Sequence, residues 1–447
     1  MRLQVMTRLL PLLLFFAMSA PLQALTVIRD AEIERSLREI AKPVLRAAGL
    51  GANSVRILVI KDNSLNAFVV DSRHIFIHSG LILRLQRPEA LQAVMAHEIA
   101  HIANGHLVRR AGNARVANRI TAVGFALAVA AAAKGEGEAA VGLGTGIASS
   151  AQRVFFGHTR AEEASADQSA LRYLARAGID PNAMSDVLNL FRGQEALSPN
   201  RQDPYARTHP LTRDRLRAVR GYVAAYQTKT RTASPETVYW YNRMDAKLEG
   251  FLRNPRSVLR KAEAKGAGET ATLRRAVAYH KRPSPKKALT EMNKLLKLRP
   301  RDPYYHELKG QILLETRNAA AAVTSYRNAA GLARGEPLIL AGLGKALLAT
   351  NTRAANSEAL KVLNVARGRD PGDPTMLRDL AVAHAKNGQN AMASVATAER
   401  YLTIGRFKEA ELHSKRAMGA LPRGSSGWLR AQDVLISVQA IPKSKRR

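Results

Sequence analysis

Apolar residues recur at helical spacing directly after the sequence Arg87-Pro88-Glu89. Pro in the first turn of a helix and an acidic residue near its positive dipole end are typical of a helix start. The apolar positions that follow are Ala90, Leu91, Val94, Met95, Ile99 and Ile102. This spacing predicts an amphipathic helix, with one apolar face in the core and a polar face opposite.

Residues 1–24 follow the pattern of a secretory signal peptide. Two arginines precede an apolar run from Leu9 to Ala20, and the segment closes with Pro21-Leu22-Gln23-Ala24. The run is too short to span a bilayer as a helix. We expect cleavage after Ala24, because cleavage after Ala20 would place Pro21 directly beyond the cut.

In the second half of the chain alanine and leucine dominate and strand alternation disappears. Helix starts recur at Asp302-Pro303, Glu336-Pro337 and Asp373-Pro374, and the three prolines lie 34 and 37 residues apart. A period of 34 residues is that of tetratricopeptide repeats. We therefore expect a helical linker over 223–269 and a tetratricopeptide-like array over 270–440, with an unrelated helical bundle as the alternative. Such an array presents a concave surface to peptides or partner proteins.

The chain is strongly basic. Its formal net charge is +33, residues 251–300 hold 14 Lys or Arg against 3 Glu, and the tail 441–447 is basic as well. Nucleic acid commonly binds such charge, but a secreted protein does not meet it and no nucleic-acid motif is present, so we expect no nucleic-acid partner. Peripheral contact with an anionic membrane, contact with an acidic partner and a merely solvated basic surface remain as alternatives.

The chain contains no cysteine. It can therefore form no disulfide, no cysteine zinc site and no lipid anchor on a cysteine. We expect the mature protein to be soluble or peripherally associated with a membrane.

The sequence His97-Glu98-Ile99-Ala100-His101 places two imidazoles one helical turn apart. Residues four apart share one face of a helix, so both side chains can bind one tetrahedral Zn²⁺. Glu98 can accept a proton from water on that metal. The alternative is a pair of solvated histidines on a surface helix. The motif predicts a zinc peptidase site.

A catalytic zinc site needs a third protein ligand. The metzincin pattern requires Gly and His at the positions of Asn104 and Leu107, so that subclass is excluded. His106 comes one residue too early, and we expect it to be exposed near the helix end and to bind no metal. Glu163 offers a carboxylate, and Asp167, four residues later, can accept the free ring N–H of a ligand histidine. An ordinary acidic helix start is the alternative for this pair.

The two motifs resemble those of the gluzincin peptidases, a family that includes the CAAX prenyl endopeptidase, the membrane heat-shock protease and the periplasmic β-barrel assembly-enhancing protease. Two further segments fit the family. Asn66-Ala67-Phe68 and His78-Ser79-Gly80-Leu81 match its strand pair ahead of the active-site helix, and Thr208-His209-Pro210 with Arg215 matches its downstream His-Pro segment. The resemblance covers roughly residues 30 to 222.

The resemblance implies that His97, His101 and Glu163 bind one Zn²⁺ per chain and that Glu98 is the catalytic base. For His209 it leaves two roles, stabilising the oxyanion of the tetrahedral intermediate or occupying the open metal position and holding the enzyme latent. A structural histidine in a turn before proline is the third alternative.

The resemblance also implies a mainly α fold, in which a gluzincin-like metallopeptidase domain with a small β-sheet over 25–222 precedes the helical repeat solenoid. The hairpin Asp71-Ser72-Arg73-His74 departs from the family, whose members more often carry glycines there. An extended substrate is expected to pair with the strand near the catalytic helix. Its residues are Ala67, Phe68, Val69 and Val70.

A second apolar run, Thr121 to Ala133, separates the two segments that carry candidate ligands and is too short to span a bilayer. It is either a helical flap beside the active-site cleft or a buried helix followed by a glycine-rich turn. The sequence does not assign a role to residues 121–150.

The two-part layout resembles that of the β-barrel assembly-enhancing member of the family. It implies a periplasmic zinc endopeptidase of a Gram-negative envelope, acting in quality control of outer-membrane proteins. Unfolded or misassembled outer-membrane proteins are the expected substrates, and the repeat array would recruit them or dock to the β-barrel assembly machinery, with degradation and assisted assembly as outcomes. The alternative is a chaperone or scaffold with a latent or capped metal site, acting through the array.

Overall fold

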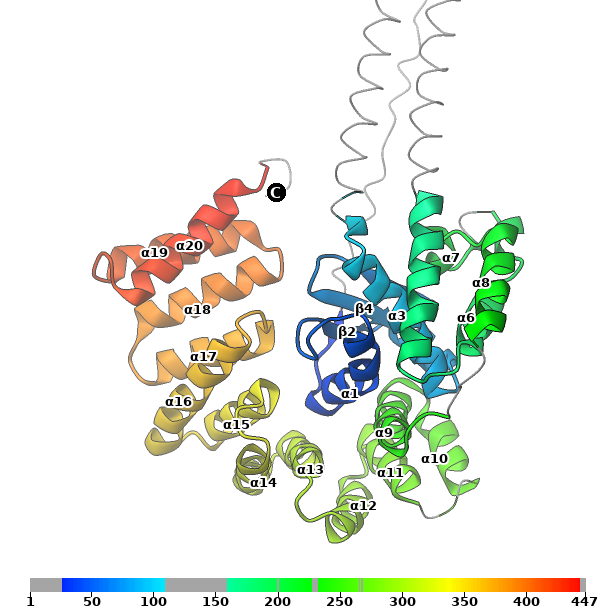
Figure 1. Cartoon of the computed structure of the whole chain (residues 1–447). Helices are drawn as coiled ribbons and strands as arrows, with labels where there is room; N and C mark the ends of the chain where they lie inside the picture. Colours follow the sequence, from blue (N-terminus) through cyan, green and yellow to red (C-terminus); the bar gives the residue numbers. More distant parts are fainter. Residues whose placement is uncertain are drawn as a thin grey trace, which may run out of the picture.

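A computed structural model describes residues 26–107, 109, 159–198, 201–226, 232–264, 266 and 268–442 of the chain (Figure 1). The signal peptide, the run Thr121–Ala133 and residues 443–447 of the basic tail lie outside the described residues. The expectations for these three segments therefore stay predictions. Among the described residues, no helix is both long and apolar enough to cross a membrane.

A four-stranded sheet forms the platform of the N-terminal part. Its strands are β1 (Val27–Ile28), β2 (Arg56–Ile60), β3 (Ala67–Val69) and β4 (His74–His78), in the order β1-β2-β4-β3. β2 pairs in parallel with β4, and β3 pairs antiparallel with β4 and so lies at an edge of the sheet. The strand pair expected ahead of the catalytic helix is therefore present.

The hairpin between β3 and β4 turns without glycine. The Asp71 carboxylate accepts the backbone N–H of Arg73 at 2.7 Å and lies 2.9 Å from Nδ1 of His74. An Asp side chain that bonds the backbone two residues on imitates a backbone turn. This side chain supplies the turn geometry in a hairpin that contains no glycine.

Gly80 fixes how β4 runs into α2 (Ser79–Arg84). Its N–H donates to the carbonyl of Asp62 at 2.8 Å, and a Cβ at this position would lie 2.1 Å from the carbonyl oxygen of Asn63. Only glycine permits so close a backbone approach. The segment His78–Leu81 therefore holds the chain against the loop after β2.

The predicted helix after Arg87 is α3 (Pro88–Ala103), with Pro88 in its first turn. Every residue from Ala90 to His101 is buried, so the side of the helix that carries the candidate ligands is covered as well as the apolar side. The reason is long-range packing, because α3 lies among α1 (Ala31–Ala47), the helical residues 159–176 and α6 (Asn182–Leu190). α3, which carries the candidate ligands His97 and His101, therefore lies at the centre of the N-terminal part.

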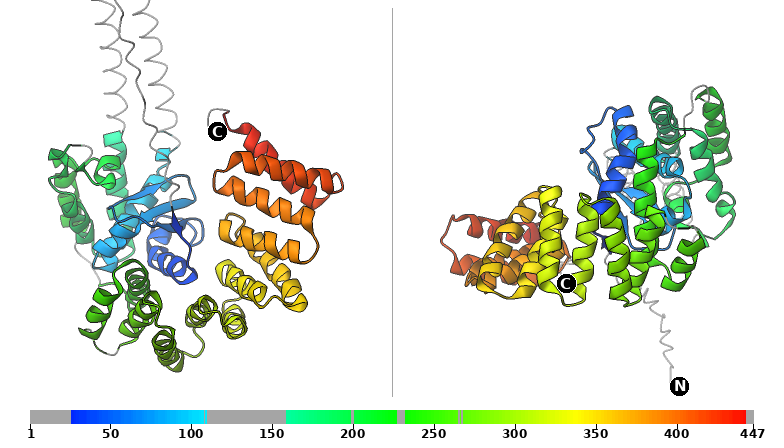
Figure 2. Two further views of the ribbon diagram at one scale, coloured as in Figure 1. Left: turned by 180° about the vertical axis from the view of Figure 1, so that it is seen from behind. Right: turned by 90° about the horizontal axis from the view of Figure 1, so that it is seen from below.

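The second half of the chain is a curved array of antiparallel helices (Figures 1 and 2). They are α9 (Pro235–Leu252), α10 (Pro255–Ala264), α11 (Glu269–Lys281), α12 (Pro285–Leu298), α13 (Pro303–Glu315), α14 (Ala319–Leu332), α15 (Pro337–Thr350), α16 (Arg353–Arg369), α17 (Pro374–Lys386), α18 (Asn390–Thr403), α19 (Phe407–Ala420) and α20 (Ser426–Ala440). The expected starts at Pro303, Pro337 and Pro374 are confirmed, and Asp302 and Asp373 cap two of these helices with their side chains. The tetratricopeptide-like array is thus confirmed.

Small residues let neighbouring helices of the array approach closely. The ring of Tyr326 in α14 lies between Gly310 of α13 and Gly342 of α15, and a Cβ at either glycine would meet a ring carbon at 2.8 or 2.4 Å. One aromatic side chain therefore joins three successive helices, and a larger residue at either glycine would separate them.

The array is joined to the N-terminal part of the chain, because α1 packs against the first helices of the array. Ala31 of α1 shares an apolar cluster with Tyr304, Ala329 and Ile339. Arg243 of α9 is buried between the carboxylates of Glu32 in α1 and Asp302 at the start of α13, and the ring centre of Tyr305 is 4.2 Å from its guanidinium carbon. The segment expected as a linker therefore forms a packed joint with α1. The concave side of the array already holds this helix of the N-terminal part.

A second contact joins the sheet to the array further along. Asp370, at the end of α16, accepts hydrogen bonds from Arg56 of β2 at 2.8 Å and from Arg29. Burial raises the pKa of Asp370, but the hydrogen bond and the charges of the two guanidinium groups outweigh it, and the pKa falls to about 2. The ion pair therefore stabilises the contact at any pH at which the carboxyl is charged.

We predict that Asp370→Asn lowers the stability of the protein at neutral pH by roughly 2 kcal/mol, because two partly buried guanidinium groups lose one of their carboxylate partners and keep only the others, such as Glu34. The folded pKa lies below the ordinary value, so this stabilisation is present above about pH 4 and disappears as the pH falls through about 2. Urea unfolding followed by the fluorescence of Trp240, which borders the joint, measures both effects. Glu409→Gln, which removes an exposed pair with Arg406, is the control and should change nothing; equal losses in both variants would contradict the account.

Candidate metal centre

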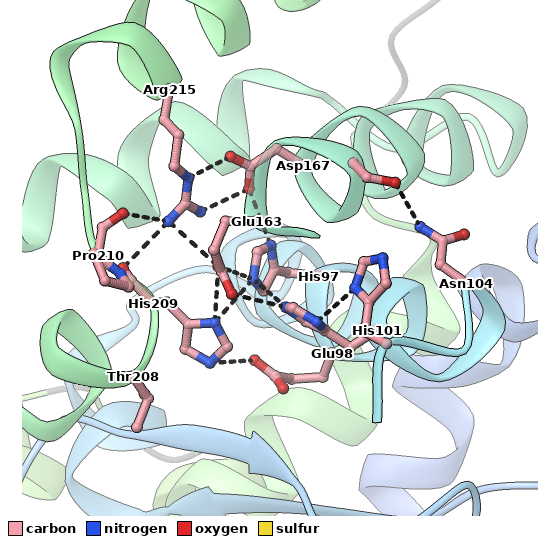
Figure 3. A network of polar contacts seen from close by, with 12 residues as sticks. His97, Glu98, His101, Asn104, Glu163, Asp167, Thr208, His209, Pro210 and Arg215 are labelled. Carbon is pink, nitrogen blue, oxygen red and sulfur yellow. Dashed lines mark hydrogen bonds and ion pairs between the residues drawn. The ribbon is translucent and has the colours of Figure 1, made fainter. Parts of the chain in front are cut away.

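Four side chains direct donor atoms towards one point in the centre of the peptidase part (Figure 3). His97 and His101 come from α3, Glu163 from the helical residues 159–176, and His209 from the residue after α7 (Pro204–Thr208). One ring nitrogen or carboxylate oxygen of each lies within 4.8 Å of the others. The structure therefore brings together three residues expected as ligands and the His of the downstream motif.

The atoms facing the common point are defined by short distances. Nε2 of His97 is 3.1 Å from Nε2 of His101, 3.2 Å from Oε2 of Glu163 and 3.2 Å from Nδ1 of His209. All four side chains are buried, none with more than 5% of its surface exposed. Three imidazole nitrogens and one carboxylate oxygen at such spacing are a donor set that suits a tetrahedral metal ion.

Asp167 lies behind His97, as the spacing of Glu163 and Asp167 predicted. Its Oδ1 is 3.0 Å from Nδ1 of His97, on the ring edge that faces away from the common point. Burial lowers the pKa of His97, but the hydrogen bonds to Asp167 and Glu163 outweigh it and raise the pKa to about 10. The contact leaves Nε2 of His97 as the ring nitrogen for a metal.

Arg215 organises the acidic side of the site, a role that the sequence did not assign to it. Its guanidinium bonds both oxygens of Asp167 at 2.7 and 2.9 Å and lies 3.3 Å from Oε2 of Glu163. Burial raises the pKa of each carboxyl, but it is outweighed in both: contacts with His209 and His97 lower the pKa of Glu163, and contacts with Arg215 and His97 lower that of Asp167. Both acids are therefore held as carboxylates although they are buried.

The same guanidinium fixes the segment that carries His209. Nη1 of Arg215 donates to the carbonyl oxygens of His209 and Pro210 at 3.2 and 2.9 Å. Arg215 stands in the first turns of α8 (Arg213–Tyr226), so its position is set by a helix start. The signal for this role was present in the sequence as the Arg that accompanies the His-Pro motif.

Glu98 lies on the opposite side of His209. Its Oε1 is 3.5 Å from Nε2 of His209, and its side chain is fully buried. The buried ring of Tyr205, which the sequence did not single out, packs against His209 with ring centres 4.6 Å apart. Because the imidazole of His209 is held between Glu163 and Glu98, the site is closed to solvent in this conformation.

His106 is buried, and the expectation that it is exposed near the helix end is wrong. It has 1% of its surface exposed, and its Nδ1 lies 2.8 Å from Nδ1 of His101. The contact is on the ring edge of His101 that faces away from the common point, so His106 stays outside the converging donors. No local pattern indicates this burial, because α3 ends at Ala103 and the position of His106 depends on the turn that follows.

The expected substrate strand lies beside the covered site. Ala67 in β3 is buried, whereas Val70, directly after the strand, has 53% of its surface exposed. Tyr205 at the start of α7 donates its backbone N–H to the carbonyl of Leu65 at 3.1 Å. The short helix that leads to His209 is therefore tied to the chain just ahead of the edge strand.

Residues 28–223 match the family described as Peptidase family M48. These residues are therefore similar to the peptidases of that family. The buried group of three histidines and one glutamate agrees with this assignment, since it provides a metal-binding donor set in the centre of the matched region. The chain is a metallopeptidase, as its sequence predicted.

Two relatives match beyond the M48 domain. The β-barrel assembly-enhancing protease of Escherichia coli (strain K12) is 27% identical over 372 residues, which are 80% of this chain and 74% of that protein. The β-barrel assembly-enhancing protease of Yersinia pestis is 25% identical over 374 residues, with the same shares. A solved structure of a thermophilic TPR protein from Thermus thermophilus also matches. The match covers 38% of this chain and the whole of that protein, at 20% identity and a TM-score of 0.26. Both matched proteases resemble the chain over more than its peptidase domain.

We predict that Glu163→Gln weakens metal binding by at least tenfold, because an amide oxygen carries no charge to offset that of a divalent ion. Competition with a chromophoric chelator measures the affinity. Glu162→Gln, one residue earlier on the same helical segment, removes a carboxylate outside the converging donors and is the matched control. Equal affinity of the Glu163 variant and the wild type would contradict the placement of this ligand.

Proposed function

We propose that the chain is a periplasmic zinc endopeptidase that acts on outer-membrane proteins in the quality control of a Gram-negative envelope. The observation that carries the peptidase activity is the convergence of His97, His101 and Glu163 with Glu98 beside them. The names of the two matched proteases support the outer-membrane substrates. The signal-peptide pattern of residues 1–24 supports the periplasmic location.

Zinc is the ion that the donor set favours. Two imidazoles and one carboxylate are the ligands of catalytic zinc sites that keep a fourth position for water, and the chain has no cysteine to favour softer metals. His97, His101 and Glu163 would hold one Zn²⁺ per chain. When bound, the ion would lower the pKa of its water and polarise the scissile carbonyl.

Glu98 acts as the general base in this proposal. It follows His97 directly in α3, so its carboxylate is fixed by the same buried helix as two of the ligands. It takes a proton from the attacking water and gives it to the leaving amine. Asp167 holds the His97 ring by its far edge, and Arg215 holds Asp167, so neither ring nor carboxylate needs to reorganise during the reaction.

An extended segment of substrate would add to the edge of the sheet at β3. No strand among the described residues pairs with β3 on the side away from β4. Strand addition supplies main-chain hydrogen bonds and so suits unfolded segments of many sequences. The residues Ala67 to Val70 would then lead the substrate past Glu98.

We predict that Glu98→Gln keeps the metal and loses cleavage by about 10²- to 10⁴-fold, because the amide cannot accept the proton of water. Purified protein is incubated with an unfolded outer-membrane protein, and metal content is measured on the same sample. Cleavage at the wild-type rate in this variant would rule out Glu98 as the base and leave the scaffold alternative in place.

His209 is proposed as a latch rather than as an oxyanion donor. Its Nδ1 is among the four converging donor atoms and lies 3.0 Å from Oε2 of Glu163, where a fourth ligand would stand. Water and substrate need that position in a catalytic zinc site. The burial of the whole group supports a resting state in which the His209 segment must move before cleavage begins.

If His209 is a latch, we predict that His209→Ala cleaves an unstructured substrate faster than the wild type and also cuts itself. An oxyanion role predicts instead a loss of about 10²-fold with metal retained. His306→Ala in the array, which removes a contact with the carbonyl oxygen of Pro300, serves as the control and should match the wild type. Slower cleavage by a metal-loaded His209 variant would refute the latch.

The helical array is proposed to recruit substrates or to dock to the β-barrel assembly machinery. Its first helices contact α1 and hold the ion pairs of Arg243, and Asp370 at the end of α16 pairs with Arg56, so the helices after α16 are the part left for a partner. The basic segment 251–300 offers a face for an anionic membrane. A latch at His209 also favours the second candidate function, that of a chaperone. Its metal site would stay capped and inactive until the folding of a bound substrate protein stalls.

A further inference from the structure

The two candidate ligand histidines have different neighbours on their far ring edges. His97 turns Nδ1 to the carboxylate of Asp167 at 3.0 Å. His101 turns Nδ1 to another imidazole, Nδ1 of His106, at 2.8 Å. His101 and His106 each have 1% of their surface exposed, and their ring centres are 4.8 Å apart. A short contact between two buried ring nitrogens needs a donor on one side and an acceptor on the other.

The position of His101 decides which ring is the donor. Its Nε2 faces the common point, 3.1 Å from Nε2 of His97 and 3.4 Å from Oε1 of Glu163. A ligand nitrogen carries no hydrogen, so the hydrogen of His101 is on Nδ1 when Nε2 binds a metal. His106 must then accept at Nδ1 and carry its own hydrogen on Nε2. In this state both imidazoles are neutral.

The chain is shaped to bring His106 back over His101. α3 is followed by Asn104 and Gly105, and Gly105 has a φ of +67°, in the left-handed region that glycine adopts without strain. Its N–H closes the turn by donating to the carbonyl of Ile102 at 3.0 Å. Asn104 bonds the hydroxyl groups of Ser165 and Ser169, which ties this turn to the Glu163 helix. The turn is therefore fixed both by its own backbone hydrogen bond and by the contacts of Asn104 with the Glu163 helix.

We propose that His106 is a positioning residue for the metal centre, which fixes the tautomer and ring plane of His101 by accepting its Nδ1–H. The proposal rests on the metal site proposed above. A neutral acceptor suits this edge, because the site already holds the buried carboxylates of Glu98, Glu163 and Asp167 against the guanidinium of Arg215. A further carboxylate at position 106 would add another buried negative charge.

Two variants separate the hydrogen bond from packing. His106→Asn places an amide oxygen close to where Nδ1 stands, so it keeps an acceptor for His101. His106→Leu fills similar space without an acceptor. We expect the Leu variant to bind zinc about 10- to 100-fold more weakly, as is typical when the partner of a ligand histidine is lost, and the Asn variant to stay within a few-fold of the wild type. Equal losses in both variants, or wild-type affinity in the Leu variant, would overturn the proposal.

A spectroscopic readout tests the hydrogen bond directly. In protein loaded with Co²⁺, the Nδ1–H protons of His97 and His101 should give shifted resonances that exchange slowly, because Asp167 and His106 hold them. The Leu variant should lose the resonance of His101 and keep that of His97. A wild-type spectrum without a protected His101 resonance would refute the role of His106 even if the variants do not fold. Absence of metal binding by the wild type would instead refute the metal centre itself.

Discussion

The guanidinium of Arg215 is the interaction on which the candidate metal centre depends. It joins Asp167, Glu163 and the carbonyl oxygens of His209 and Pro210, which come from two separate segments of the chain. Two carboxylates that are buried this deeply would otherwise take up protons, and a protonated Glu163 would be a poor metal ligand. Removing one partner of such a buried group costs about 3–5 kcal/mol. One cation thus holds Asp167 as a carboxylate and fixes the segment that carries His209.

The rest of the fold fixes the position of this group of side chains relative to the helical array. α3 is covered on all sides, so its two histidines have no freedom to turn towards solvent. α1 packs on α3 with one face and on the first helices of the array with another, and Arg243 and Asp370 add buried ion pairs at two points of the joint. A partner bound to the later helices would therefore be held at a defined distance from β3 and the closed site.

The sequence predicted most of the site because its chemistry is local. His97, Glu98 and His101 share one helical turn, and Glu163 and Asp167 share another, so spacing alone places each pair on a face. The role of Arg215, the burial of His106 and the packing of α1 into the array depend on contacts between segments far apart in the chain. The same contacts bury the side of α3 that carries the candidate ligands, which hydrophobic periodicity alone does not predict. The repeat period predicted the array but not what fills its concave side.

The central claim is that this buried group is a zinc-dependent endopeptidase site. It is tested most directly by following the cleavage of an unfolded outer-membrane protein by purified wild type and His209→Ala before chelation, after chelation and after one equivalent of Zn²⁺ is restored. The account predicts that chelation abolishes cleavage in both proteins and that the single equivalent restores it. Cleavage that continues unchanged in the chelated, metal-free protein would contradict it.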